Sequence, residues 1–243
     1  SAVIASIHIQ DCNNEDNTNE SSPTKADDKK GKRWKGFQRA ASNTDAWILF
    51  LQFGVSAGGN AAMLNSATLY FEQAMGLSSS SASAISSAVG WLGLLCFFGG
   101  WTSDKLMTRM GLVGRKWSQF LFLFIGGALL VLFSFVENIA LSIVVFVAFS
   151  LSLTLTVSST FALVSYVNAP VGSVAGIVAS GVSVFDLIFL MLIQNLEYQY
   201  AFLTMGVTIV VASFVTAVLR LRVETDSGEL AQQQSDEESI NNV

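Results

Sequence analysis

Six long apolar stretches joined by short connections constrain the fold of this chain more than any other feature. Long runs between Trp47 and Arg220 carry no charge, whereas both ends of the chain are dense with charges. Charged residues make up 13% of the 243 residues, against about 25% in soluble domains. A helix of about 20 apolar residues crosses the roughly 30 Å of hydrocarbon in a bilayer. The pattern predicts an all-α, polytopic membrane helix bundle. A large soluble protein with six buried helices would need a polar shell that this chain lacks.

We place the six-span transmembrane domain in residues 45–222. A cytoplasmic linker at 1–44 precedes it and an acidic tail at 223–243 follows it, and we expect both to be mostly disordered. The predicted spans are Ala46–Phe71, Ser81–Thr102, Trp117–Val136, Ile139–Val167, Val171–Ile193 and Gln199–Leu219. No initiator methionine and no signal-peptide pattern occur at the start, so we expect the sequence to begin inside a longer protein.

The distribution of positive charge predicts the orientation of the spans. All 13 Lys and Arg residues lie in the N-terminal linker, in the loop from Ser103 to Lys116, or after the sixth span at Arg220 and Arg222. With six spans these segments share one side, while Glu137 and Glu197 lie in the opposite loops. Cytoplasmic loops retain Lys and Arg, so we expect both termini to be cytoplasmic. The plasma membrane is the expected location. Five residues suit interfacial aromatic belts on the two sides: Trp47, Trp101, Trp117, Tyr198 and Tyr200.

The residues that usually carry enzyme chemistry are sparse and scattered. Cys12 lies in a polar segment and Cys96 in an apolar span, so we expect no disulfide between them. His8 is the sole histidine, and no cluster of Cys, His, Asp and Glu has metal-ligand spacing. The sequence has no Gly-rich phosphate loop and no nucleophile elbow. We therefore predict no enzyme, no metal or other cofactor, and no nucleic-acid partner.

A charged, glycine-containing motif lies between the second and third spans. It reads Gly99-Gly100-Trp101-Thr102-Ser103-Asp104-Lys105, then Arg109, Gly111 and Gly114-Arg115-Lys116. This resembles the signature loop of the major facilitator superfamily, whose residues here are Gly100, Asp104, Lys105, Arg109, Gly111, Arg115 and Lys116. We expect Asp104 to face the positive end of a neighbouring helix and the cations to pair with it and with headgroups. An ordinary positive loop would explain the cations but not the Gly-Gly-x-x-x-Asp spacing.

A narrower resemblance covers most of the membrane region. The first span is similar to the seventh span of the eukaryotic nitrate/nitrite porter family at Phe53, Gly54, Gly58, Asn65, Tyr70 and Phe71. The likeness continues in order at 29–44, 99–116, 161–167 and Gly172-x-x-x-Gly176. It implies that these six helices form one half of a major facilitator fold, the last six of twelve, opposite an N-terminal six-helix half. It also implies a symporter for nitrate or nitrite with protons, working by alternating access in nitrate assimilation.

The sequence departs from the porter pattern at two informative places. Where the family carries an anion-binding arginine in its eighth span, this chain has Cys96. Where the family's eleventh span has Gly-x-Gly-Gly-Asn, this chain reads Ala179-Ser180-Gly181-Val182-Ser183. No predicted span contains Lys or Arg. An anion would meet only backbone amides, helix N-termini and neutral side chains, unless the other half supplies a cation.

Polar side chains inside the spans give the candidate site. Asp186 is an ionisable residue in the interior of the fifth span, where a charge costs about 2.5 to 3.5 kcal/mol. It is the candidate for proton coupling, or else a water-linked carboxyl without a transport role. Buried amides bind oxyanions or join helices. The predicted substrate-binding residues are Asn60, Asn65, Cys96, Ser180 and Ser183.

Two further patterns concern packing, and two other functions remain open. We expect the Ser and Thr residues of 150–160 to bond to carbonyls of their own helix. We expect Gly172, Gly176 and Ser180 to form a small-residue stripe that permits close helix contact. The alternatives to a small-anion transporter are a non-transporting sensor or scaffold, favoured by Cys96 and Val182, and a facilitator for a different, organic solute.

Overall fold

The computed structural model describes residues 34–216, and this part of the chain is a bundle of helices without strands. Six helices in it are long and apolar enough to cross a membrane, which confirms the predicted membrane helix bundle. The elements are α3 (Thr44–Phe53), the π-helical turn η1 (Gly54–Gly58), α4 (Gly59–Gln73), α5 (Ser79–Gly90), the 3-10 turn η2 (Trp91–Leu95), α6 (Cys96–Met110), α7 (Leu112–Phe133), α8 (Ile139–Val164), α9 (Val171–Asn195) and α10 (Tyr198–Val215).

The first two spans are each built from two helices joined by an irregular turn. The first runs over Thr44–Gln73 with η1 in its middle, and the second runs over Ser79–Met110 with η2 in its middle. The second span continues eight residues beyond the predicted end at Thr102, through the charged residues of the signature motif. The prediction of a loop from Ser103 to Lys116 was therefore wrong. The turn is confined to Gly111, whose φ of 64° and ψ of −152° favour glycine.

Local sequence signals fix where several helices begin. The Asn43 side chain accepts a hydrogen bond from the Asp45 amide at the start of α3, and Asn138 accepts from the amides of Ala140 and Leu141 at the start of α8. The Ser78 hydroxyl caps α5 in the same way. These side chains satisfy amides that have no partner inside the helix. Pro170 precedes α9, where its missing amide costs no helical hydrogen bond.

Two groups of helices pack around α7 and α9. The α7 helix packs against α8, α10 and α6, and α9 packs against α3, η1 and α4. Glycines allow the closest of these approaches. A Cβ on Gly127 would lie 2.8 Å from the Val210 amide, and one on Gly206 would lie 2.7 Å from the Val131 side chain. The α7 and α10 backbones therefore approach each other closely, as small residues permit between membrane helices.

The π-helical turn interlocks with α9. A Cβ on Gly58 would lie 2.8 Å from the backbone nitrogen of Asp186, and one on Gly181 would lie 2.6 Å from the carbonyl oxygen of Phe50. A Cβ on Gly54 would meet the ring of Phe185. The π turn thus presents two glycines to α9 where a helix with side chains would not fit. Single π turns occur often at functional sites.

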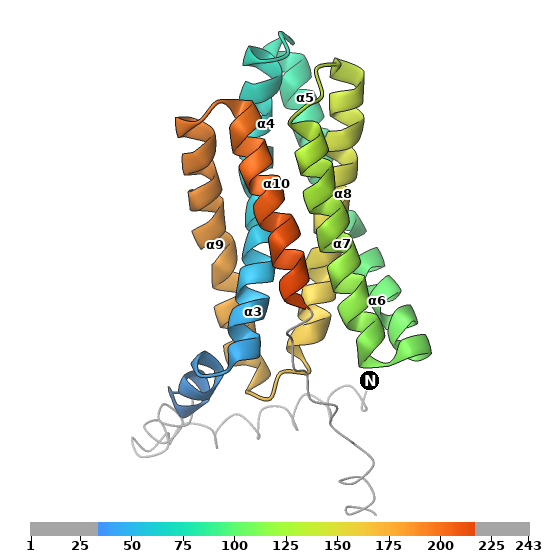
Figure 1. Ribbon diagram of the computed structural model, residues 1–243, viewed down its shortest axis with the longest axis vertical. Helices are drawn as coiled ribbons and strands as arrows, with labels where there is room; N and C mark the ends of the chain where they lie inside the picture. Colours follow the sequence, from blue (N-terminus) through green and yellow to red (C-terminus); the bar gives the residue numbers. More distant parts are fainter. Residues whose placement is uncertain (1–33, 217–243) are drawn as a thin grey trace, which may run out of the picture.

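The second and fifth spans are the most exposed in the bundle. Only 17% and 22% of the residues in their most apolar stretches are buried, against 56% in the first span. Figure 1 shows α9 at one edge of the bundle and α6 reaching outward at the lower end of the other edge. Large side chains of the second span, such as Trp91, Leu94 and Phe97, are more than half exposed. These two spans therefore offer surfaces that the other helices leave uncovered.

The described end of the predicted linker is helical. Residues 34–41 form a short helix that turns away from the axis of α3 at the lower end of the bundle, dark blue in Figure 1. The turn between α6 and α7 lies at the same end. The Trp47 indole nitrogen donates to the carbonyl of Ala41 at 2.7 Å and fixes the corner between this helix and α3. The remainder of the linker and the predicted acidic tail lie outside the described residues.

Candidate functional site

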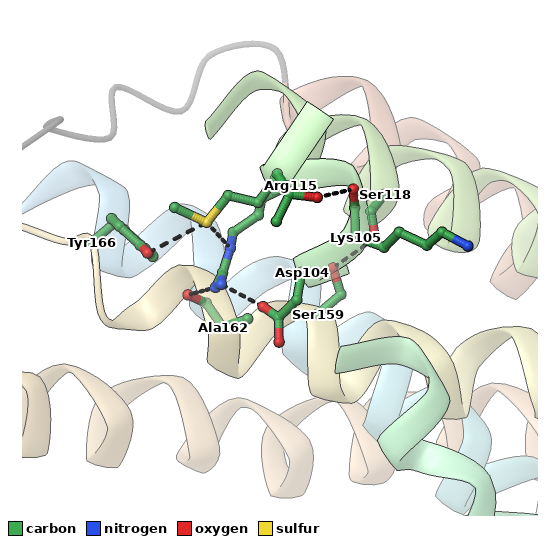
Figure 2. A network of polar contacts seen from close by, with 9 residues as sticks. Asp104, Lys105, Arg115, Ser118, Ser159, Ala162 and Tyr166 are labelled. Atoms are coloured by element: carbon green, nitrogen blue, oxygen red, sulfur yellow. Dashed lines mark hydrogen bonds and ion pairs between the residues drawn. The ribbon is translucent and has the colours of Figure 1, made fainter. Parts of the chain in front are cut away.

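The signature motif forms a compact network around Arg115 (Figure 2). The guanidinium donates to the Asp104 carboxylate and, at 2.9 Å, to the carbonyl of Ala162. Its Nε lies 2.8 Å from the sulfur of Met107, and its centre lies 5.1 Å from the centroid of the Tyr166 ring. Arg115 therefore joins the end of α6, the start of α7 and the end of α8. The planar guanidinium suits this site because it bonds and stacks at once.

Three other motif residues, Lys105, Gly114 and Arg109, lie near this network. Lys105 lies over the Trp101 ring at 5.0 Å, a cation–π contact at the exposed side of α6. A Cβ on Gly114 would meet the backbone carbonyl of Leu106, so glycine lets α7 fold back against α6. Arg109 lies on the exposed last turn of α6. The predicted pairing of Asp104 with a motif cation is confirmed for Arg115.

The candidate substrate residues lie on three spans, the first, second and fifth, and form no hydrogen bonds with one another within residues 34–216. Asn60 accepts a hydrogen bond from the Ser150 hydroxyl at 2.8 Å, which joins α4 to α8. Cys96 is the first residue of α6, its thiol is free and partly exposed, and its carbonyl accepts from Ser158 at 2.5 Å. Both contacts anchor their spans on α8.

Asp186 is a residue of α9 and lies against the π turn of the first span. Its backbone nitrogen faces Gly58, and one carboxylate oxygen is buried without a hydrogen-bond partner among the described residues. The side chain as a whole is partly exposed. A buried carboxylate oxygen inside a membrane span is costly unless a proton, water or another group meets it.

Three other predicted residues face outward. Asn65 on α4 is exposed, as are Ser180 and Ser183 on α9. The Ser180 hydroxyl donates to the carbonyl of Ile177 in its own helix at 2.7 Å. Gly172 and Gly176 have no atom within 4 Å of an added Cβ. The small-residue stripe therefore makes no close helix contact within residues 34–216, which corrects the predicted packing role for this part of the chain.

Sequence reasoning missed the interhelical role of α8. Thr156 and Thr160 do bond to carbonyls of their own helix, as predicted for 150–160. Ser150, Ser152 and Ser158 instead donate to α4, α7 and α6. Their spacing gives no signal of this, because a hydroxyl reaches its own helix and a neighbour equally well.

Two buried amides also connect helices. The Gln52 side chain donates to Thr216 and the Gln119 side chain to Thr160, each at 2.8 Å. The amide oxygens of both glutamines have no partner among the described residues.

A mainly apolar cavity of about 250 Å³ lies near Thr216 and is lined by Val113, Lys116, Trp117 and Phe120. None of the six predicted binding residues lines it.

Comparisons with known proteins identify the family. A family model described as Major Facilitator Superfamily matches residues 13–189, most of the chain. High-affinity nitrate transporter 2.3 of Oryza sativa subsp. japonica is 30% identical over 147 residues, which are 59% of this chain and 28% of that protein. High affinity nitrate transporter 2.7 of Arabidopsis thaliana is 33% identical over 141 residues, which are 57% of this chain and 29% of that protein.

A more distant relative extends the same pattern. Nitrate transporter 2.1 of Chlamydomonas reinhardtii is 27% identical over 155 residues, 63% of this chain and 28% of that protein. The chain thus spans less than a third of the length of the curated relatives that it matches. These relatives confirm the resemblance to nitrate/nitrite porters, and the six-helix bundle agrees with half of a major facilitator fold. With its signature network in place and most of its length matched by the family model, the chain belongs to the major facilitator superfamily.

Proposed function

We propose that this chain forms one half of a secondary active transporter that carries a small anion, nitrate or nitrite, together with protons. Substrate binds near the middle of the membrane between this half and an N-terminal six-helix half, and the two halves rock to expose it to each side in turn. The relatives whose names denote nitrate transporters support the substrate class. Both termini face the cytoplasm of a plasma-membrane protein, in accord with the positive-inside rule.

The proposal rests on polar residues that are exposed on the outside of this bundle although they lie inside membrane spans. Asn65, Ser180 and Ser183 lie in spans, yet they face away from the other helices of this bundle. The Ser180 hydroxyl donates to a carbonyl of its own helix, but the Asn65 amide and the Ser183 hydroxyl would be left unsatisfied if they faced lipid. A water-filled cavity against a second half would satisfy them. The poorly buried second and fifth spans supply the surface for such a half.

Uptake of labelled nitrate into vesicles that contain the whole protein tests this function. We expect accumulation above protein-free vesicles when the outside is acidic, and loss of accumulation when a protonophore removes the gradient. Absence of nitrate and nitrite uptake at every pH would remove both as substrates. Uptake that does not depend on the proton gradient would refute proton coupling but still support the anion as substrate.

Asp186 is our candidate for the proton-binding residue. Its unpartnered carboxylate oxygen beside the π turn supports this role. Asp186→Asn is expected to abolish uphill accumulation while it leaves nitrate exchange across the membrane intact. Glu137→Gln, which makes the same change from carboxylate to amide in an exposed loop between two spans, is the matched control and retains coupling. Coupled accumulation by Asp186→Asn would contradict the assignment.

A non-transporting sensor or scaffold is the second candidate, and Cys96 favours it. The porter family carries an arginine at this position, and no Lys or Arg occurs within the middle of any described span. Cys96→Arg separates the two functions, with Cys96→Met as a control of similar bulk without charge. Stronger nitrate binding by the arginine variant alone supports an anion site with altered chemistry. No change in either variant favours the sensor or scaffold.

A further inference from the structure

We propose that the helix at 34–41 is a membrane-surface element that binds the anionic cytoplasmic leaflet. This inference does not depend on the transported substrate. The helix has three distinct faces that follow from the periodicity of about 3.6 residues per turn. One face packs on the protein, one carries aromatic rings and one carries cations.

The first face holds the helix against the bundle. Ala40 is fully buried among residues of α3, α8 and α9. A Cβ on Gly36, one turn earlier, would lie 3.4 Å from the Pro170 ring, just before α9 begins. Together with the Trp47 bond to the Ala41 carbonyl, these contacts fix the helix at the end of the first and fifth spans. The helix is therefore held at the level where the spans leave the hydrocarbon.

The second face is aromatic and uncovered. Trp34 and Phe37 lie three residues apart, stack with ring centroids 5.9 Å apart, and are 61% and 45% exposed. Exposed aromatic pairs are unfavourable in water but suit the boundary between headgroups and acyl chains. Trp47 is half exposed at the start of the first span. This face matches the apolar side of an interfacial helix.

The third face is cationic. Lys35 and Arg39 lie four residues apart, both exposed, on the side of the helix away from the aromatic pair. A juxtamembrane basic segment gains attraction to anionic lipids from each cation. The positive charge of this face therefore favours contact with an anionic leaflet over a neutral one.

Fluorescence of Trp34 in nanodiscs tests the proposal on the whole chain. The signal of Trp34 is the difference between the wild type and Trp34→Phe, since the other tryptophans remain in both. We expect quenching by phosphatidylcholine brominated near the glycerol end of its acyl chains. We expect the quenching to rise when phosphatidylserine is present and to fall with added salt.

Charge-neutralising variants test the anionic part of the inference. Lys35→Gln and Arg39→Gln should each weaken the contact of the helix surface with phosphatidylserine, so that the ratio of lipid to acrylamide quenching of Trp34 falls about fivefold. Lys105→Gln is the matched control, because this exposed cation at the same end lies over Trp101. Three results would overturn the proposal. They are Trp34 quenching by aqueous acrylamide but not by brominated lipid, shielding of Trp34 from both quenchers, and quenching by brominated lipid that is indifferent to phosphatidylserine and salt.

Discussion

Gly58→Ala tests whether the contact between the π turn and α9 is as tight as the geometry implies. The new methyl group would lie 2.8 Å from both the Asp186 nitrogen and the Val182 carbonyl oxygen, and 3.0 Å from the Phe185 Cβ. Two of these neighbours are backbone atoms of a helix, so no side-chain rotation relieves the clash. Overpacking of this kind costs about 1 to 3 kcal/mol. Replacing glycine by alanine in a helix returns roughly 0.5 to 1 kcal/mol.

The net expectation is a loss of about 1 to 2 kcal/mol in the free energy of unfolding. Reversible unfolding in mixed micelles, with SDS as denaturant, measures this loss. Gly100→Ala is the control, because its nearest neighbour is the Ser158 Cβ at 3.9 Å, an ordinary contact. The control should match or exceed the wild type in stability. Equal stability of Gly58→Ala and Gly100→Ala would refute the argument that α9 is packed against a backbone surface.

The polar contacts give three further stability predictions. Arg115→Lys should cost about 1 to 2 kcal/mol in the same unfolding assay, because lysine keeps the charge beside Asp104 but loses the Ala162 bond and the stacking on Tyr166. Asp104→Asn should cost under about 1 kcal/mol, because the Asp104 side chain is 62% exposed; a larger loss than in Arg115→Lys would contradict this ranking. Gln119→Leu should change stability by less than about 1 kcal/mol, because it removes an unpartnered buried oxygen along with the bond to Thr160. A loss of several kcal/mol would show that another group satisfies that oxygen.

Hydropathy was sufficient to predict the number of spans but not all of their limits. Each span needs a long apolar helix, and such stretches stand out in this sequence. The second span was predicted to end at Thr102, yet its helix continues to Met110 through charged residues. Hydropathy marks where a helix leaves the hydrocarbon, whereas the helix itself ends where Gly111 adopts a positive φ. Backbone geometry therefore set this boundary, not polarity.

The internal breaks of the first two spans could not be predicted. The π turn at Gly54–Gly58 exists where two glycines meet α9, and that partner lies far away in the sequence. The 3-10 turn at Trp91–Leu95 precedes a carbonyl that α8 satisfies through Ser158. Both breaks are tertiary features. A single sequence reveals the glycines but not which helix approaches them.

The sequence predicted an ion pair within the signature motif but not the partners of the polar residues inside the spans. The Gly-x-x-x-Asp spacing correctly indicated the motif, and Arg115 proved to be the cation that pairs with Asp104. Asn60, by contrast, is joined to Ser150, a residue expected to bond within its own helix. The positions of Asn65, Ser180 and Ser183 on exposed faces depend on how the helices rotate in the bundle. Short polar side chains carry too little periodicity to fix that rotation.

The close pairing of α7 with α10 has a consequence for biosynthesis. The glycine surface of α7 at Gly127 is complete only when Gly206 reaches it, and α8 and α9 are synthesised in between. During that interval the glycine surface of α7 faces lipid or the insertion machinery. Nascent chains that stop before α10 would leave this glycine surface uncovered and become targets for membrane quality control. Ribosome arrest on either side of Tyr198 would therefore separate chains that are degraded from chains that survive.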